Sequence, residues 1–105
     1  MNAPSTPIAG TKHDAGKPRF SLLPQDVIWS VVAVLEFGAA KYGTDNWKTV
    51  PGAKERYFDA AHRHIAAWRA GELTDPESGL PHLSHAICSL MFASWLDTHQ
   101  DKETP

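Results

Sequence analysis

The sequence predicts an all-α fold: a small helical bundle of three main helices plus ordered loops, completed by homo-oligomerisation. Apolar residues recur at helical spacing in three segments, whereas strand signals are weak. Proline and glycine punctuate the ends of these segments. The 105 residues suffice for one domain, so we expect a flexible N-terminal arm at residues 1–11, a single helical domain at 12–97 and a polar tail at 98–105.

The first helix is expected at about residues 24–40. Pro24 suits a first helical turn, and Gln25 and Asp26 favour the positive end of the helix dipole. The apolar residues of this segment form one stripe: Val27, Ile28, Val31, Val32 and Leu35. The segment that follows, residues 41–52, contains turn formers throughout and is expected to form an ordered loop.

The second and third helices are expected at about residues 53–70 and 81–97. One face of the second carries Tyr57, Ala61, Ile65 and Trp68. The third is apolar almost all round, which indicates burial on more than one side. A domain of this size is only marginally stable alone, so we expect the second buried side to meet another subunit.

Composition excludes several classes of protein. The chain is 42% hydrophobic and 10% aromatic, as a globular protein is. Ten basic and twelve acidic residues give a net charge of −2, which argues against binding of duplex nucleic acid. The lone Cys88 lies in an apolar run and is expected to be a buried core thiol in a reducing compartment. With neither a signal peptide nor a membrane-spanning stretch, we expect a cytoplasmic protein without a membrane partner.

Residues 12–20 form the first candidate site. They place three cations around Gly16, just before the first helix: Lys12, Lys17 and Arg19. Backbone amides of a glycine-containing loop together with cations suit a phosphate chain, although a solvated basic loop explains the spacing as well. His13 and Asp14 also invite comparison with metal-dependent phosphohydrolases built on such a dyad, but those require a larger helical scaffold.

The end of the first helix and the loop after it form the second. Glu36 lies among apolar residues, and a carboxylate buried there must find a cation or a metal. Beyond Lys41, three residues can stack on a flat ring and hydrogen-bond its edge: Tyr42, Asn46 and Trp47. In the alternative interpretation, Trp47 closes the core and Asn46 shapes a turn.

The second helix supplies the third group. Asp59 and Arg63 are four residues apart, so they fit either a site or a surface ion pair. His62 and His64 are only two apart and cannot share a helical face. At most one of the two histidines therefore belongs to a site, and an exposed His62 is the simpler assumption.

The densest group of candidate ligands spans residues 72–85: Glu72, Asp75, Glu77, His82 and His85. The two histidines are three apart and share one helical face. Carboxylates suit magnesium, whereas two imidazoles suit zinc, manganese or iron. A capped loop with histidines packed at a helix start is the alternative, but the number of ligands between apolar flanks favours a site.

Read in order, five segments carry a family resemblance: residues 12–19, 36–43 with 46–47, 63–64, 71–79 and 82–86. Together they resemble the phage-borne family named for the N-terminal domain of dATP/dGTP diphosphohydrolase, over about residues 11–97. The resemblance implies hydrolysis of a purine deoxynucleoside triphosphate to the monophosphate and pyrophosphate, which reshapes nucleotide pools during phage infection.

A looser similarity is to the all-α nucleoside triphosphate pyrophosphohydrolases of MazG type. Those enzymes bind magnesium with acidic pairs three apart on two neighbouring helices and assemble as dimers or tetramers. Here the corresponding stripe of the third helix carries His82 and His85 instead of acids. This departure indicates another metal, ligands drawn from other acids, or lost catalysis.

We therefore expect metal-dependent cleavage of a purine nucleoside triphosphate between the α- and β-phosphates. The expected catalytic residues are Glu36, Asp59, His64 and Glu77. The expected substrate-binding residues are Lys12, Lys17, Arg19, Lys41, Tyr42, Asn46, Trp47 and Arg63. The expected metal ligands are Glu72, Asp75, His82 and His85, holding Mg²⁺, or Mn²⁺ or another transition metal because of the two histidines.

Two other functions fit the same sequence. One is a non-catalytic phage protein that binds and sequesters a nucleotide, for which basic and aromatic residues suffice. The other is a small interaction module whose histidines are structural.

Overall fold

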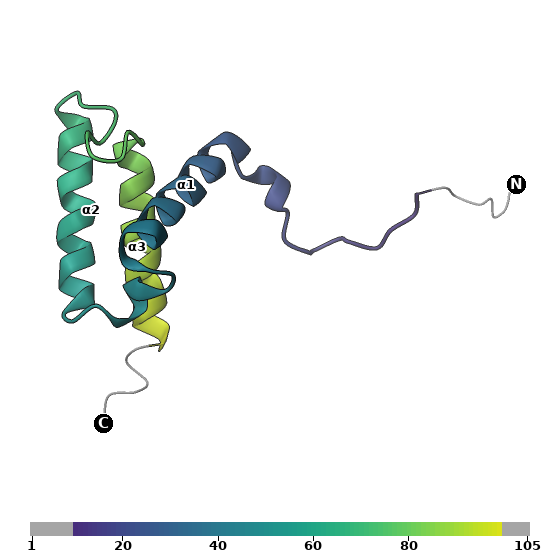
Figure 1. The fold of residues 1–105 in the computed structure, drawn as a ribbon. Coiled ribbons are helices and arrows are strands. Elements are labelled where there is room, and N and C mark those ends of the chain that lie inside the picture. Colours follow the sequence, from purple (N-terminus) through teal and green to yellow (C-terminus); the bar gives the residue numbers. More distant parts are fainter. Residues whose placement is uncertain (1–9, 100–105) are drawn as a thin grey trace, which may run out of the picture.

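The computed structural model describes residues 10–99 and confirms the all-α prediction (Figure 1). Its three α-helices are α1 (Gln25–Tyr42), α2 (Ala53–Arg69) and α3 (His82–His99). Two short 3-10 helices, η1 (Phe20–Leu22) and η2 (Asn46–Thr49), precede and follow α1. α2 and α3 lie side by side and run in opposite directions, and α1 crosses α3 obliquely (Figure 1). Within residues 10–99 no helix has the length and apolar character needed to span a membrane.

The helix ends differ from the predicted ends by about two residues. α1 continues to Tyr42 because the stop is Gly43, whose φ of 98° suits glycine and whose N–H donates to the carbonyl of Ala39 at 2.8 Å. α3 continues to His99, two residues into the predicted tail. The predicted loop between α1 and α2 is ordered and contains η2. Residues 1–9 of the predicted arm and 100–105 of the predicted tail lie outside the described residues.

Small side chains and one cysteine make up much of the buried interior. Ala61 on α2 and Ala86 on α3 are almost fully buried, which lets these helices approach closely. Cys88 is buried as predicted, and its thiol donates to the carbonyl of Val31 on α1 at 3.5 Å. α3 is therefore the central helix, with α2 on one side and α1 on another.

An aromatic cluster fixes η2 to α3. Trp47 stacks on Phe92 with ring centroids 4.4 Å apart, and it meets Trp95 edge-on at 5.1 Å. The hydroxyl of Tyr57 on α2 donates to the carbonyl of Trp47 at 2.9 Å. Trp47 thus closes the core, the second of the two interpretations that its sequence position allowed.

Part of the predicted core faces solvent. On α2, Ile65 and Trp68 share the face of Ala61 by their spacing, but each is 39% exposed and so only partly covered. The adjacent His64 is half-buried and adds a polar contact to His82 of α3. The outer faces of α1 and α3 also leave large apolar side chains exposed: Val27, Trp29, Val32, Leu83, Ile87, Leu90 and Met91. Assembly with a second copy, which would cover these faces, stays a prediction.

Candidate functional site

An open groove of about 950 Å³ runs between the three helices, η2 and the loop from residue 72 to residue 81. It gathers residues from three of the four predicted groups: Glu36, Lys41, Tyr42, Asn46, Trp47, Arg63, His64, Asp75, Glu77 and His85. The roles of these residues stay predictions. Their location along one groove meets the geometric condition that a shared site imposes.

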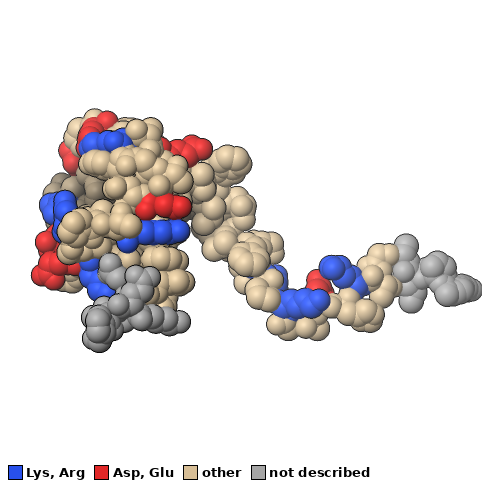
Figure 2. Space-filling model, turned by 60° about the horizontal axis from the view of Figure 1, so that its bottom comes forward, with Lys and Arg blue, Asp and Glu red and all other residues tan. Residues whose placement is uncertain are grey.

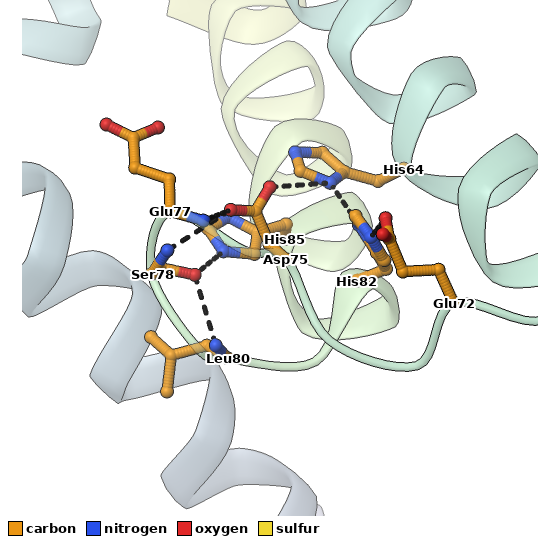
Figure 3. A network of polar contacts seen from close by, with 8 residues as sticks. All are labelled: His64, Glu72, Asp75, Glu77, Ser78, Leu80, His82 and His85. Atoms are coloured by element: carbon orange, nitrogen blue, oxygen red, sulfur yellow. Dashed lines mark hydrogen bonds and ion pairs between the residues drawn. The ribbon is translucent and has the colours of Figure 1, made fainter.

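A cluster of three histidines and one carboxylate lies where the loop between α2 and α3 meets these helices (Figure 3). His64 projects from α2, His82 and His85 project from α3, and Asp75 comes from the loop between these helices. The Nδ1 atoms of His64 and His82 are 2.9 Å apart, and His64 Nδ1 is 3.9 Å from Asp75 Oδ2. The ring of His85 stacks on that of His64 at 4.6 Å. We call His64, Asp75, His82 and His85 the histidine cluster.

The local sequence of the loop explains the position of Asp75. Its Oδ1 accepts the N–H groups of Glu77 and Ser78, at 2.8 and 3.1 Å, which makes an Asx turn. Its own N–H donates to the carbonyl of Leu80, and the N–H of Gly79, at φ 73°, donates back to Asp75. Because Oδ1 and the backbone are held in this way, Oδ2 is directed at His64.

Hydrogen bonds to residues around the histidine cluster orient two of its imidazoles (Figure 3). His82 Nε2 lies 2.7 Å from Glu72 Oε1, so Nε2–H donates to the carboxylate and the lone pair of the neutral ring is on Nδ1. Ser78 Oγ lies 2.7 Å from His85 Nε2 and also accepts the N–H of Leu80. The Ser78 hydroxyl, which has one proton and a second lone pair, thus holds His85 Nε2 with either tautomer of the His85 ring.

Burial and neighbouring groups shift the pKa values of three cluster residues. Burial, together with the neighbouring His85 and His82, lowers the pKa of His64, and Asp75 offsets part of this effect. Burial also lowers the pKa of His85. Burial alone would raise the pKa of Asp75, but the N–H groups of Ser78 and Glu77 outweigh it and lower that pKa. These shifts favour neutral imidazoles at His64 and His85 and a carboxylate at Asp75 at neutral pH.

Cations and an ion pair lie along the same groove. Lys41, at the end of α1, pairs with Glu77 of the loop and lies 5.1 Å from the ring centroid of Tyr42. The hydrogen bond to Glu77 is the main reason that the pKa of Lys41 is raised. Arg63 of α2 is the second predicted cation of the groove. A phosphate chain beside the histidine cluster would meet positive charge from two helices.

Some predicted residues do not reach the groove. The segment from residue 10 to residue 23 leaves the bundle as an exposed arm, and Figure 2 shows its cations standing apart from the helices. Residues 14–17 form a turn closed by the N–H of Lys17 and the carbonyl of Asp14, with Gly16 at φ 82°. The arm's exposed cations, Lys12, Lys17 and Arg19, do not line the groove. Within one subunit, the predicted phosphate loop and the histidine cluster are separate.

The remaining candidates on α2 lie on faces of the helix that do not line the groove. Asp59 is exposed and does not line the groove, so the structure does not bring it to the predicted cluster. His62 is exposed and contacts the ring of Phe58 at 4.5 Å, as the choice of His64 over His62 expects. Glu72 joins the cluster only through its bond to His82.

Sequence reasoning missed two residues at this site. Arg56 lines the groove as a third cation, and its seven-residue distance from Arg63 is a helical-face signal that could have identified it. Ser78 is not among the predicted site residues, yet it hydrogen-bonds His85. No sequence signal identifies that contact, because it depends on how the loop folds back onto α3.

Comparison with known proteins gives two matches. The family model described as dATP/dGTP diphosphohydrolase, N-terminal, matches residues 7–104. A dATP/dGTP diphosphohydrolase of Salmonella phage PMBT28 is 40% identical over 90 residues, which make up 85% of this chain and 30% of the relative. The chain thus spans less than a third of that relative's length. No solved structure matches the chain, and the looser similarity to MazG-type enzymes stays a prediction.

Proposed function

The chain belongs to the family of dATP/dGTP diphosphohydrolase N-terminal domains, and from this premise we propose that its groove binds and hydrolyses a purine deoxynucleoside triphosphate. The products would be the monophosphate and pyrophosphate, and the reaction would adjust nucleotide pools during phage infection. The named relative is more than three times as long as the matched region, so the proposal concerns what this chain does by itself.

The single observation that carries the proposal is the histidine cluster beside the groove cations. The cluster combines imidazole nitrogens with a carboxylate oxygen, a donor set that fits a divalent metal. When bound, such a metal neutralises phosphate charge and activates water. Lys41 and Arg63 would hold the phosphates beside it, which contributes positioning and electrostatic stabilisation.

Two carboxylates of the groove are proposed to serve in proton transfer, and one of them also pairs with the lysine that would bind phosphate. Glu36 on α1 and Glu77 in the loop both line the groove, and either carboxylate can accept a proton from the attacking water. Glu77 also holds Lys41 in the free protein. A bound triphosphate would compete for Lys41 and would release Glu77 for proton transfer.

The base is proposed to lie at the η2 end of the groove. Tyr42 is 62% exposed and would leave its contact with Lys41 to stack on a ring, and Asn46 can hydrogen-bond a base edge. Trp47 is held by Phe92 and Trp95, so it would form the wall behind the base. Asp59 and the arm cations have no part in this one-subunit arrangement.

Homo-oligomerisation remains part of the proposal. Trp29 on α1 is 74% exposed and Leu90 on α3 is 55% exposed, and apolar surfaces of this kind commonly mark contacts between subunits. Sedimentation of the chain should give a mass above the 11.5 kDa of one copy. Leu90→Glu should reduce that mass, and a wild-type chain that sediments as a monomer would refute this part.

The enzymatic proposal is tested with the purified chain, dGTP or dATP, and a divalent metal. We expect pyrophosphate and the monophosphate to appear in equal amounts. Turnover no faster than in buffer, with every metal tried, would refute hydrolysis. Intact nucleotide recovered from the denatured complex would then favour sequestration, and no rise in melting temperature with any nucleotide would favour an interaction module.

A further inference from the structure

We propose that His64, Asp75 and His82 form a three-ligand site for a transition metal of the zinc or cobalt class, through Nδ1 of both imidazoles and Oδ2 of the carboxylate. The inference rests on the proposed function for the metal's role in turnover, but metal binding itself can be tested without nucleotide. The proposed ion is thus a transition metal in place of the Mg²⁺ expected from the sequence. His85 and Glu72, which were expected to be metal ligands, become positioning residues.

Donor chemistry separates the two metal classes. Magnesium takes oxygen donors in near-ideal octahedral geometry and gives up water reluctantly. Imidazole nitrogens suit zinc, copper, iron and nickel, and two histidines with one carboxylate form a common three-ligand set for metals that keep open positions. Two of the three donors here are nitrogens from His64 and His82. The cluster therefore favours a transition metal.

The distances fit a single ion. Two ligand atoms that each lie about 2.1 Å from a metal cannot be more than about 4.2 Å apart. His64 Nδ1 is 2.9 Å from His82 Nδ1 and 3.9 Å from Asp75 Oδ2, so both pairs meet this limit. All three ligand atoms lie within 4.8 Å of one another, so side-chain movements of less than about 1 Å would complete the site.

The hydrogen bonds of His82 direct a lone pair at the proposed ion. Its Nε2–H donates to Glu72, so the neutral ring presents an unprotonated Nδ1 to Nδ1 of His64. His82 is only 4% exposed, so bulk water has little access to that lone pair. A shared proton can bridge the two nitrogens, and a metal ion that both nitrogens bind would replace it. A carboxylate that fixes the far nitrogen of a histidine ligand is a frequent feature of metal sites.

His85 supports the site without being a ligand. Its Nε2 is engaged by the hydroxyl of Ser78, and its ring stacks on that of His64 with an interplanar angle of 11°. The stacking fixes the plane of the His64 ring. Because His64 and Asp75 line the groove and His82 does not, the open metal positions would face the groove where the triphosphate is proposed to bind.

The test is metal titration of the untagged, metal-free full chain without nucleotide, followed by calorimetry and by the visible absorption of Co²⁺. We expect one Co²⁺ or Zn²⁺ per chain, bound at least 10-fold more tightly than Mg²⁺. His64→Ala should weaken this binding by 100-fold or more, and Glu72→Gln by about 10-fold. The matched control is His62→Ala, an exposed histidine on the same helix, which should bind as the wild type does.

Circular dichroism checks that each variant is folded, and ¹⁵N imidazole spectra of the wild type provide a readout that needs no variant. Zinc should shift Nδ1 of two histidines and leave His85 Nε2 unligated. Failure of Co²⁺ and Zn²⁺ to bind, binding no tighter than that of Mg²⁺, or full binding by His64→Ala would overturn the inference. Metal binding without turnover would instead refute the proposed function and leave the site intact.

Discussion

Trp47→Ala distinguishes a core tryptophan from a base-stacking one. The Trp47 ring stacks on Phe92 at 4.4 Å and meets Trp95 edge-on at 5.1 Å. Each aromatic pair contributes about 0.5–1.5 kcal/mol beyond the burial of area, so the two pairs contribute about 1–3 kcal/mol. The partly buried Trp47 ring also removes apolar area from water, which adds to this contribution. We therefore expect Trp47→Ala to lower the free energy of unfolding by about 2–4 kcal/mol.

Urea unfolding followed by far-ultraviolet circular dichroism measures this loss, because tryptophan fluorescence would itself change with the substitution. Trp47→Phe, which keeps a ring against Phe92, should lose less than Trp47→Ala. The control is Trp68→Ala on α2, a more exposed tryptophan outside the aromatic cluster, which should lose about 1 kcal/mol or less. An unchanged unfolding midpoint for Trp47→Ala, together with weaker nucleotide binding, would refute the assignment of Trp47 to the core.

Three further predictions concern the thiol, the histidines and the groove lysine. Burial raises the pKa of the Cys88 thiol to about 11 from 9.0, so at pH 8 a thiol reagent should label the folded chain about 100-fold more slowly than the urea-unfolded chain; equal rates would contradict this. Burial lowers the pKa of His64 and His85 below 6.5, so the unfolded chain binds more protons than the folded one. The free energy of unfolding of the metal-free protein should therefore fall as the pH drops from about 6.5 through the folded pKa values, and urea titrations that show a rise would contradict the shift. Lys41→Met should weaken dGTP binding, measured by calorimetry, by about 10-fold without moving the urea midpoint, because its ion pair with Glu77 is exposed; unchanged affinity would remove Lys41 from the site.

Helical periodicity and punctuation were enough to predict the three helices. The β-branched run at Val31 is helical as expected, because its neighbours follow the helical period. The helix ends were less accurate, since α1 continues to Tyr42, two residues beyond the predicted Ala40 and up to Gly43. A stop residue acts through its own backbone angle and the carbonyls it caps, and apolar spacing does not contain that information.

The packed face of α2 could not be derived from its apolar residues. Ala61 is buried as predicted, but Ile65 is exposed while the adjacent His64 turns toward α3. A polar residue occupies this face because His82 and Asp75 provide partners for it. These partners come from another helix and from a loop, and only the tertiary fold brings them near His64. A periodicity analysis of one helix does not include such contacts.

The candidate site was predictable in its residue types and less so in its arrangement. The acids and histidines between residues 72 and 85 stood out by density, and the structure places Asp75, His82 and His85 together. Helical geometry predicted only that His62 and His64 lie on different faces, and the structure shows that His64 is the one at the cluster. The detachment of the arm carrying Lys12 and Lys17 was not predictable, because a glycine-containing basic turn has the same sequence whether or not it meets a groove.

The most direct test of the central claim follows dGTP by ³¹P NMR with three forms of the untagged chain: wild type, His64→Ala and His62→Ala. The account predicts that the wild type and His62→Ala convert dGTP to dGMP and pyrophosphate with added divalent metal, and that His64→Ala, folded by circular dichroism, does not. Wild-type turnover by His64→Ala, or release of inorganic phosphate or triphosphate in place of pyrophosphate, would contradict it.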